Sequence, residues 1–166
     1  VLPYNPKATQ KAMQRQLAAK GIATHLGQGV AQVAAKQLLF DDGSNLDYDA
    51  LLWVTGAVPA PWFAGTGLAT DARGFLATDD QLRSLSHPEV FAAGDCASQV
   101  NHPREKAGVF AVRQGPVLAE NVLRAAKGLP LRSHRPQRRF LSLIATGERY
   151  ALASKGDFSA QGAWVW

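Results

Sequence analysis

The sequence predicts an α/β fold in which a parallel sheet accompanies a small antiparallel meander and a C-terminal β-hairpin. The run 49–56 is continuously apolar at its centre, as in a strand that a parallel sheet covers on both faces. A second short buried strand is expected at 90–93, followed by a long amphipathic helix at 105–127. Short extended segments around the turn at Asp42-Gly43 predict the meander.

The N-terminal part is expected to begin with a helix at 7–20. Asn5 suits the N-cap and Pro6 the first helical position, because that position needs no backbone donor. Gly21 is expected to end the helix. The first two strands of the meander are expected at 30–34 and 37–40.

The predicted helix at 105–127 contains Gly115-Pro116, where the missing backbone donor of proline predicts a kink. Gly128 is expected to end this helix, and a β-hairpin is expected at 140–154. Apolar residues three and four positions apart predict one buried helix face, formed by Val109, Val112, Pro116, Ala119, Leu123 and Ala126.

The composition is that of a globular protein, with 166 residues of which 46% are hydrophobic. No apolar run approaches the roughly 20 residues needed to cross a bilayer. Cys96 is the one cysteine, which excludes an internal disulfide and favours a cytoplasmic location. The N-terminus has neither an initiating Met nor a signal-peptide pattern, so we expect residues upstream of Val1.

The net charge of +5 is partly concentrated in a run of four arginines. Such a patch is typical of nucleic-acid binding, but Phe140 is the only aromatic residue nearby and a stacking platform needs several. We therefore interpret the run as a solvated linker and expect no nucleic-acid partner, keeping a basic nucleic-acid-binding domain as the less favoured alternative. The run consists of Arg132, Arg135, Arg138 and Arg139.

The segment 90–97, Val-Phe-Ala-Ala-Gly-Asp-Cys-Ala, carries the clearest chemistry. Gly94 lets a ligand approach the backbone, and the Asp95 carboxylate at a strand end can accept hydrogen bonds from sugar hydroxyls. The helix that follows offers unpaired N–H groups and a partial positive charge to an anionic group. Taken alone, Gly-Asp also fits an ordinary turn in which Asp95 caps a neighbouring amide.

This segment resembles the second FAD-binding motif of the pyridine nucleotide–disulfide oxidoreductase superfamily. The resemblance implies that Asp95 binds the ribityl chain of FAD, with Ala93 and Gly94 beside it. The run 49–56 is similar to the strand that closes the NAD(P) domain of that superfamily. That strand usually ends in Ala-Thr-Gly, whereas here Thr55 and Gly56 follow a valine.

Within the superfamily, the segments 91–97 and 106–116 most resemble type II NADH dehydrogenases and related quinone-linked flavoproteins, some fused to selenide, water dikinase. The resemblance implies that the backbone of Ala107, Gly108 and Val109, together with Lys106, meets the pyrimidine edge of the flavin. The implied cofactors are FAD and NAD(P)H.

The resemblance also implies a domain organisation. Residues 1–58 correspond to the C-terminal half of an NAD(P)-binding domain, 59–130 to the returning part of an FAD-binding domain, and 131–166 to a C-terminal hairpin or interface segment. Both glycine-rich pyrophosphate loops are expected upstream, because Gly27-Gln28-Gly29 lacks the third glycine and the helix of such a loop.

We expect the intact protein to pass a hydride from NAD(P)H to FAD, and electrons on to an acceptor such as a quinone. Some related dehydrogenases lie on the inner membrane face, so peripheral attachment there is also considered. This chain alone is expected to be inactive, to bind FAD weakly or not at all, and to self-associate through incompletely covered apolar surfaces. The alternative is a non-catalytic flavin-fold module with a binding or regulatory role.

No side chain is expected to act as a catalytic residue. Cys96 has no partner thiol, and we expect it to be a small buried residue without redox function. The His-Glu pair of the disulfide reductases is absent. The histidines lack metal-ligand spacing, so no metal is expected; they are His25, His87, His102 and His134.

Overall fold

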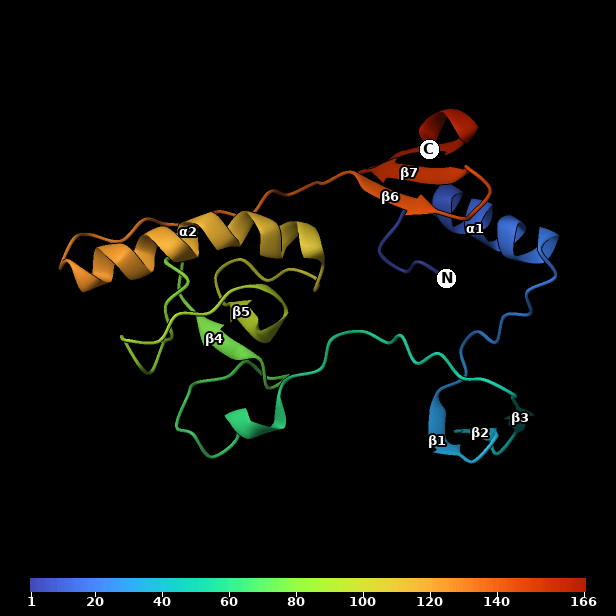
Figure 1. Ribbon diagram of the computed structural model, residues 1–166, viewed down its shortest axis with the longest axis horizontal. Helices are drawn as coiled ribbons and strands as arrows, with labels where there is room; N and C mark the ends of the chain where they lie inside the picture. The colour runs from blue at the N-terminus through green and yellow to red at the C-terminus, as the bar shows by residue number, and fades with distance from the viewer. The chain divides into compact units, whose positions relative to one another are not determined.

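The computed structural model describes residues 1–166 and divides into two compact units. Unit 1 consists of Val1–Trp53 and Arg139–Trp166, and unit 2 consists of Val54–Arg138 (Figure 1). Neither helix is long and apolar enough to cross a membrane. The division into cofactor domains at residues 58 and 130 stays a prediction, because the two units reflect packing and not cofactor binding.

Unit 1 contains the helix α1 (Lys7–Ala19), which packs on a three-stranded antiparallel sheet. The sheet consists of β6 (Ser142–Ala145), β7 (Ala151–Lys155) and β8 (Phe158–Gly162). The predicted hairpin is therefore confirmed as β6 and β7, and β8 is a third strand that the turn residues did not predict.

Polar contacts join α1 to this sheet. The buried Thr9 hydroxyl lies 2.8 Å from the Ser159 hydroxyl, so each satisfies the other. The Asn5 side-chain amide donates to the Ser154 hydroxyl at 2.8 Å instead of capping the helix. The prediction of Asn5 as N-cap is therefore wrong, and Pro6 occupies that position without a side-chain cap.

The meander forms a separate sheet within unit 1. Its strands are β1 (Val30–Ala34), β2 (Gln37–Phe40) and β3 (Asn45–Asp47), paired antiparallel in chain order as predicted. Phe40 is its buried side chain, and the ring stacks on His25 with centroids 5.8 Å apart.

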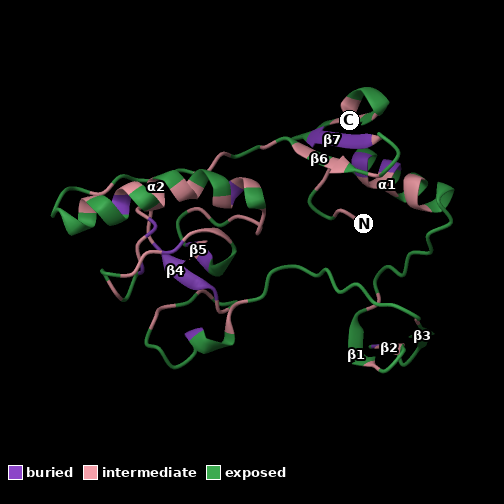
Figure 2. Cartoon of the chain, in the orientation of Figure 1, coloured by how far each residue is buried: buried purple, intermediate pink, exposed green.

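Unit 2 is built around two short parallel strands, β4 (Leu76–Thr78) and β5 (Ala97–Gln99). Figure 2 shows β4 entirely buried, and Phe63 from a short 3-10 helix, η1 (Pro61–Phe63), packs with Ala92 against both strands. The α/β class with a parallel sheet is thus confirmed.

The two strands expected in the parallel sheet are not formed as predicted. The run 49–56 is exposed and contains no strand, with Leu52 86% and Val54 78% accessible. The run forms no strand because no other segment of the chain pairs with it, and the backbone groups of a strand need hydrogen-bond partners on a neighbouring strand. The segment 90–93 contributes an isolated bridge between Phe91 and Arg83.

The second helix, α2 (Gly108–Ala126), begins three residues later than predicted and continues through Pro116. Its inward side presents Phe110 and Asn121. The predicted buried face is wrong, because Val112 is 76% and Leu123 63% exposed. Gln114 and Asn121 take inward positions beside Phe110 because their side chains bond to the backbone of unit 2.

Asn121 ties the chain that follows α2 to the body of unit 2. Its side chain has no exposed surface and donates to the carbonyl oxygens of Gln81 and Arg132, both at 2.8 Å. It also accepts from the Arg132 N–H at 2.8 Å. One buried amide therefore satisfies backbone groups of two separate loops.

Asp71 organises the turn before β4. Its carboxylate accepts hydrogen bonds from the backbone N–H groups of Arg73 at 2.9 Å and Phe75 at 3.0 Å. Burial raises the pKa of Asp71, but hydrogen bonds from Ser98 and from these two amides, with the Arg73 charge, lower it more. The net pKa of Asp71 lies below its ordinary value of 3.8.

Replacing Asn121 by alanine is expected to lower the free energy of unfolding by about 2–4 kcal/mol, because buried backbone groups lose their partners. Urea denaturation followed by circular dichroism measures this change. The control is Leu123→Ala, which removes an exposed side chain of the same helix. Equal stability of N121A and the unsubstituted chain would contradict the proposed contribution of the Asn121 hydrogen bonds.

Replacing Asp71 by asparagine is expected to lower the free energy of unfolding by about 1–2 kcal/mol at pH 7. Because folding depresses the pKa of Asp71, the stability that its carboxylate contributes is present above the unfolded value and is lost as pH falls below 3.8. Urea titrations at a series of pH values should show the two proteins converging in acid. Asp157→Asn, at an exposed turn, serves as the control.

Candidate functional site

The site begins at a tight turn that packs beneath α2. This turn is the short 3-10 helix η2 (Gly94–Cys96), in which Gly94 has a φ of +75°. The Gly94 N–H donates to the Gln114 side-chain oxygen at 2.7 Å. A Cβ at position 94 would lie 3.3 Å from the Cβ of Ala111, so both the backbone conformation and the close approach favour glycine.

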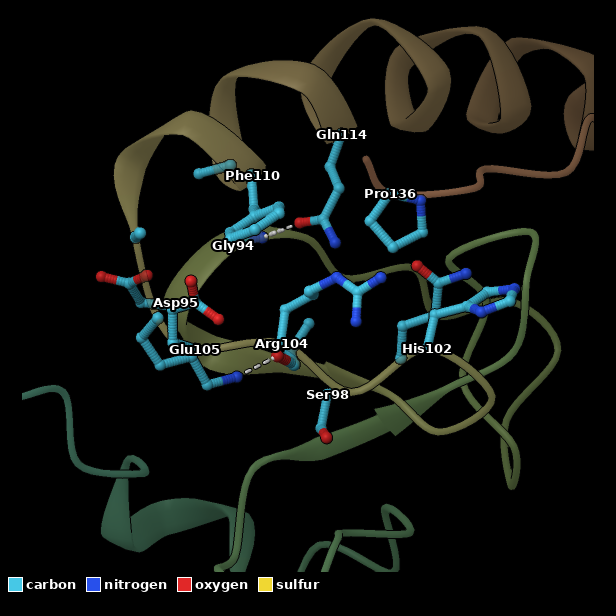
Figure 3. Close-up of a pocket in the computed structure, with 14 residues that line it drawn as sticks. Gly94, Asp95, Ser98, His102, Arg104, Glu105, Phe110, Gln114 and Pro136 are labelled. Carbon is cyan, nitrogen blue, oxygen red and sulfur yellow. Dashed lines mark hydrogen bonds between the residues drawn. The ribbon is translucent and has the colours of Figure 1, made fainter. Parts of the chain in front are cut away.

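A small cavity lies beside this turn, between η2, the loop at 102–107, the first turns of α2, and Pro136 (Figure 3). Its volume is about 30 Å³, room for about one or two water-sized groups. The cavity itself can therefore take only a few atoms of a ligand. Four of the predicted site residues line it, namely Gly94, Asp95, Lys106 and Ala107.

The other predicted site residues do not line the cavity. Ala93 directly precedes the turn, and its carbonyl accepts a hydrogen bond from the Cys96 thiol at 3.3 Å. Gly108 and Val109 form the first turn of α2, whose N-terminus no side chain caps. Thr55 and Gly56 lie in the exposed run that contains no strand, outside this cavity.

Asp95 has an exposed side chain at the edge of the cavity. It follows the bridge at Phe91 by four residues, so the apolar segment and the acidic turn are continuous. The carboxylate is open to solvent, and accepting a hydrogen bond from a ligand requires no movement of a covering group.

Lys106 turns back toward β5. Its ammonium donates to the Ala97 carbonyl oxygen and lies 4.1 Å from the centroid of the Phe75 ring. Burial lowers the pKa of Lys106, as does the Arg73 charge, while Asp71 and other acidic groups oppose the shift. Its charge therefore already has protein partners.

The sequence analysis missed several side chains of the cavity wall, including Gln99 and Gln114. Gln114 follows Phe110 by four residues on the inward side of α2, and a polar residue at such a position is a usable signal. Gln99 and His134 exchange two hydrogen bonds, from Gln99 to the His134 carbonyl at 2.8 Å and between His134 Nδ1 and Gln99 Oε1 at 3.1 Å. This pair holds the chain at Pro136 against β5.

Cys96 is exposed in the turn, and its thiol is free, so the expectation that it is buried is wrong.

No group of three or more His, Cys, Asp and Glu side chains is arranged to hold a metal ion. In the arginine run, Arg132 forms an ion pair with Glu120 at 2.6 Å, which reduces the free positive charge there.

Curated relatives of the chain are NADH-linked oxidoreductases. A probable NADH dehydrogenase of Dictyostelium discoideum is 26% identical over 143 residues, covering 86% of this chain and 32% of that protein. The mitochondrial internal alternative NAD(P)H-ubiquinone oxidoreductase A1 of Arabidopsis thaliana is 30% identical over 105 residues, covering 60% and 21%. The chain thus spans a third or less of the length of these relatives.

Solved structures share the fold. An FAD-dependent pyridine nucleotide-disulphide oxidoreductase from Desulfovibrio vulgaris superimposes with a TM-score of 0.70 at 23% identity, covering 94% of this chain and 40% of that one. The sulfide:quinone oxidoreductase of Aquifex aeolicus has a TM-score of 0.70 at 12% identity, with 96% and 42% covered.

The family model described as pyridine nucleotide-disulphide oxidoreductase matches residues 1–124. This range includes the meander, the Gly94-Asp95 turn and most of α2. On this match, which extends over more than half of the sequence, the chain belongs to the pyridine nucleotide-disulphide oxidoreductase family.

Proposed function

We propose that this chain supplies part of the flavin site of an FAD-dependent NAD(P)H oxidoreductase. The observation that carries the proposal is the Gly94-Asp95 turn, packed under α2 beside a small polar cavity. Family membership and the named activities of the relatives support FAD and NAD(P)H as the cofactors.

The residues present fit the polar arm of FAD, the ribityl chain and its phosphates. Gly94 leaves the backbone of the turn open to a close neighbour, and the exposed Asp95 carboxylate is an acceptor for a sugar-alcohol hydroxyl. Ala93, which precedes them, keeps an extended backbone that presents the turn. The cavity, at about 30 Å³, has room for only a few atoms of this arm, so the rest of FAD would lie outside it.

When bound, the flavin supplies the redox chemistry by accepting a hydride from NAD(P)H. The chain contributes the uncapped N-terminus of α2, where the backbone of Ala107, Gly108 and Val109 offers donors and a positive dipole end. Such donors stabilise negative charge on the pyrimidine edge of a flavin. Lys106 anchors the loop before this helix end through the Ala97 carbonyl and the Phe75 ring, and it is proposed to position that loop against the flavin. Thr55 and Gly56 remain proposed contacts of the cofactor.

We further propose a quinone as the electron acceptor. The relative from Arabidopsis thaliana is named for ubiquinone, and one structural neighbour is a sulfide:quinone oxidoreductase. A quinone acceptor agrees with a protein that works at the inner face of a membrane, and we propose this location beside a cytoplasmic one.

We also propose that the chain self-associates through exposed apolar side chains, such as Trp164 and Leu143.

The decisive experiment uses the full-length gene product that contains this sequence. Purified protein is expected to show a flavin absorption band, and anaerobic addition of NADH is expected to bleach that band. Release of the cofactor by acid, followed by chromatography, identifies it as FAD. A full-length protein without flavin and without NADH oxidation would instead support a non-catalytic binding or regulatory module.

Replacing Asp95 by alanine in the full-length protein is expected to weaken FAD binding about 10- to 100-fold, because a charged acceptor of the ribityl hydroxyls is removed. Isothermal titration of flavin-free protein with FAD measures the change. Glu89→Ala, at an exposed position outside the cavity, is the matched control. Equal affinities of D95A and E89A for FAD would exclude the proposed role of Asp95.

A further inference from the structure

Arg104 is an arginine without a counter-ion in the wall of the cavity. It lies in the loop before α2, and Figure 3 shows its side chain among the residues that line the cavity. Its Nη1 donates to the carbonyl oxygen of the adjacent Pro103 at 2.9 Å. Its Nε is buried and has no hydrogen-bond partner.

No carboxylate compensates the Arg104 charge. The ion pairs of arginine in this structure belong to Arg73, Arg124 and Arg132, so Asp95 and Glu105 lie in the same wall without pairing to Arg104. A buried donor of a charged group that lacks an acceptor costs free energy, and a bound acceptor would recover it.

The surroundings of Arg104 favour an oxyanion as this acceptor. A guanidinium presents a planar set of donors that matches phosphate oxygens. The ammonium of Lys106 is occupied by the Ala97 carbonyl and the Phe75 ring. His102 Nε2 in the same wall also lacks a hydrogen-bond partner, but Arg104 is the guanidinium there with an unused donor. The cavity, at about 30 Å³, has room for about one or two oxygen atoms of such a group beside Arg104.

We propose that Arg104 is the side chain that recognises a phosphate group at this cavity. If the phosphate group belongs to the diphosphate of FAD, this inference rests on the proposed function. A separate phosphate-containing molecule presents the same chemistry to Arg104. One arginine in a polar loop forms no pattern, so the sequence did not predict a role for Arg104.

The test compares ligands with and without phosphate on full-length protein freed of flavin. Arg104→Gln is expected to lower the affinity for FAD about 10- to 100-fold and to leave the affinity for riboflavin, which has no phosphate, unchanged. Arg104→Lys, which keeps the charge and loses the planar donors, is expected to bind FAD with intermediate affinity. Arg113→Gln, on the exposed side of α2, is the matched control. Fluorescence quenching of the flavin measures each affinity.

A parallel titration with inorganic pyrophosphate separates this proposal from the proposed function. Binding of pyrophosphate to the unsubstituted protein, abolished in R104Q and kept in R113Q, supports the role of Arg104 even in a protein that binds no flavin. Flavin binding that R104Q leaves unchanged, or weakens equally for FAD and riboflavin, overturns that role while the flavin site stands. Equal affinities of R104Q and R113Q for both pyrophosphate and FAD would also overturn the proposed role of Arg104.

Discussion

The contact between the η2 turn and α2 is the constraint on which the site depends. One hydrogen bond, from Gly94 to Gln114, and one close approach, to Ala111, set the distance between turn and helix. A Cβ at position 94 would crowd the Ala111 side chain and would also strain the backbone, which has a φ of +75° there. This contact brings the acidic turn and the uncapped helix end to one cavity, so the site is a product of backbone packing.

Buried amides provide the second level of organisation in unit 2. Asn121 and Gln99 both bond to the chain that follows α2, the first near Arg132 and the second at His134. Each amide has both a donor and an acceptor, so it fits one register of that chain and no neighbouring one. The chain after the helix is thereby held where Pro136 can close the cavity.

Local signals in the sequence predicted local structure well. Gly21 and Gly128 have positive φ and end their helices, and the meander and the C-terminal hairpin form where turn residues indicated them. The failures concern burial, which depends on contacts far along the chain. The apolar run at 49–56 has no partner strand, and the inward face of α2 is chosen by Asn121 and its loops. The Gly94-Asp95 turn was found through a motif, whereas the hydrogen bonds of Gln99 to His134 join residues that no spacing in the sequence connects.

Helix α2 has apolar side chains on opposite sides. Phe110 points into unit 2, while Val112 and Leu123 face water in this chain. A helix with apolar side chains on two sides is typical of one that packs between two layers. The exposed side of α2, which the periodicity predicted to be buried, has the composition expected where a second layer would pack.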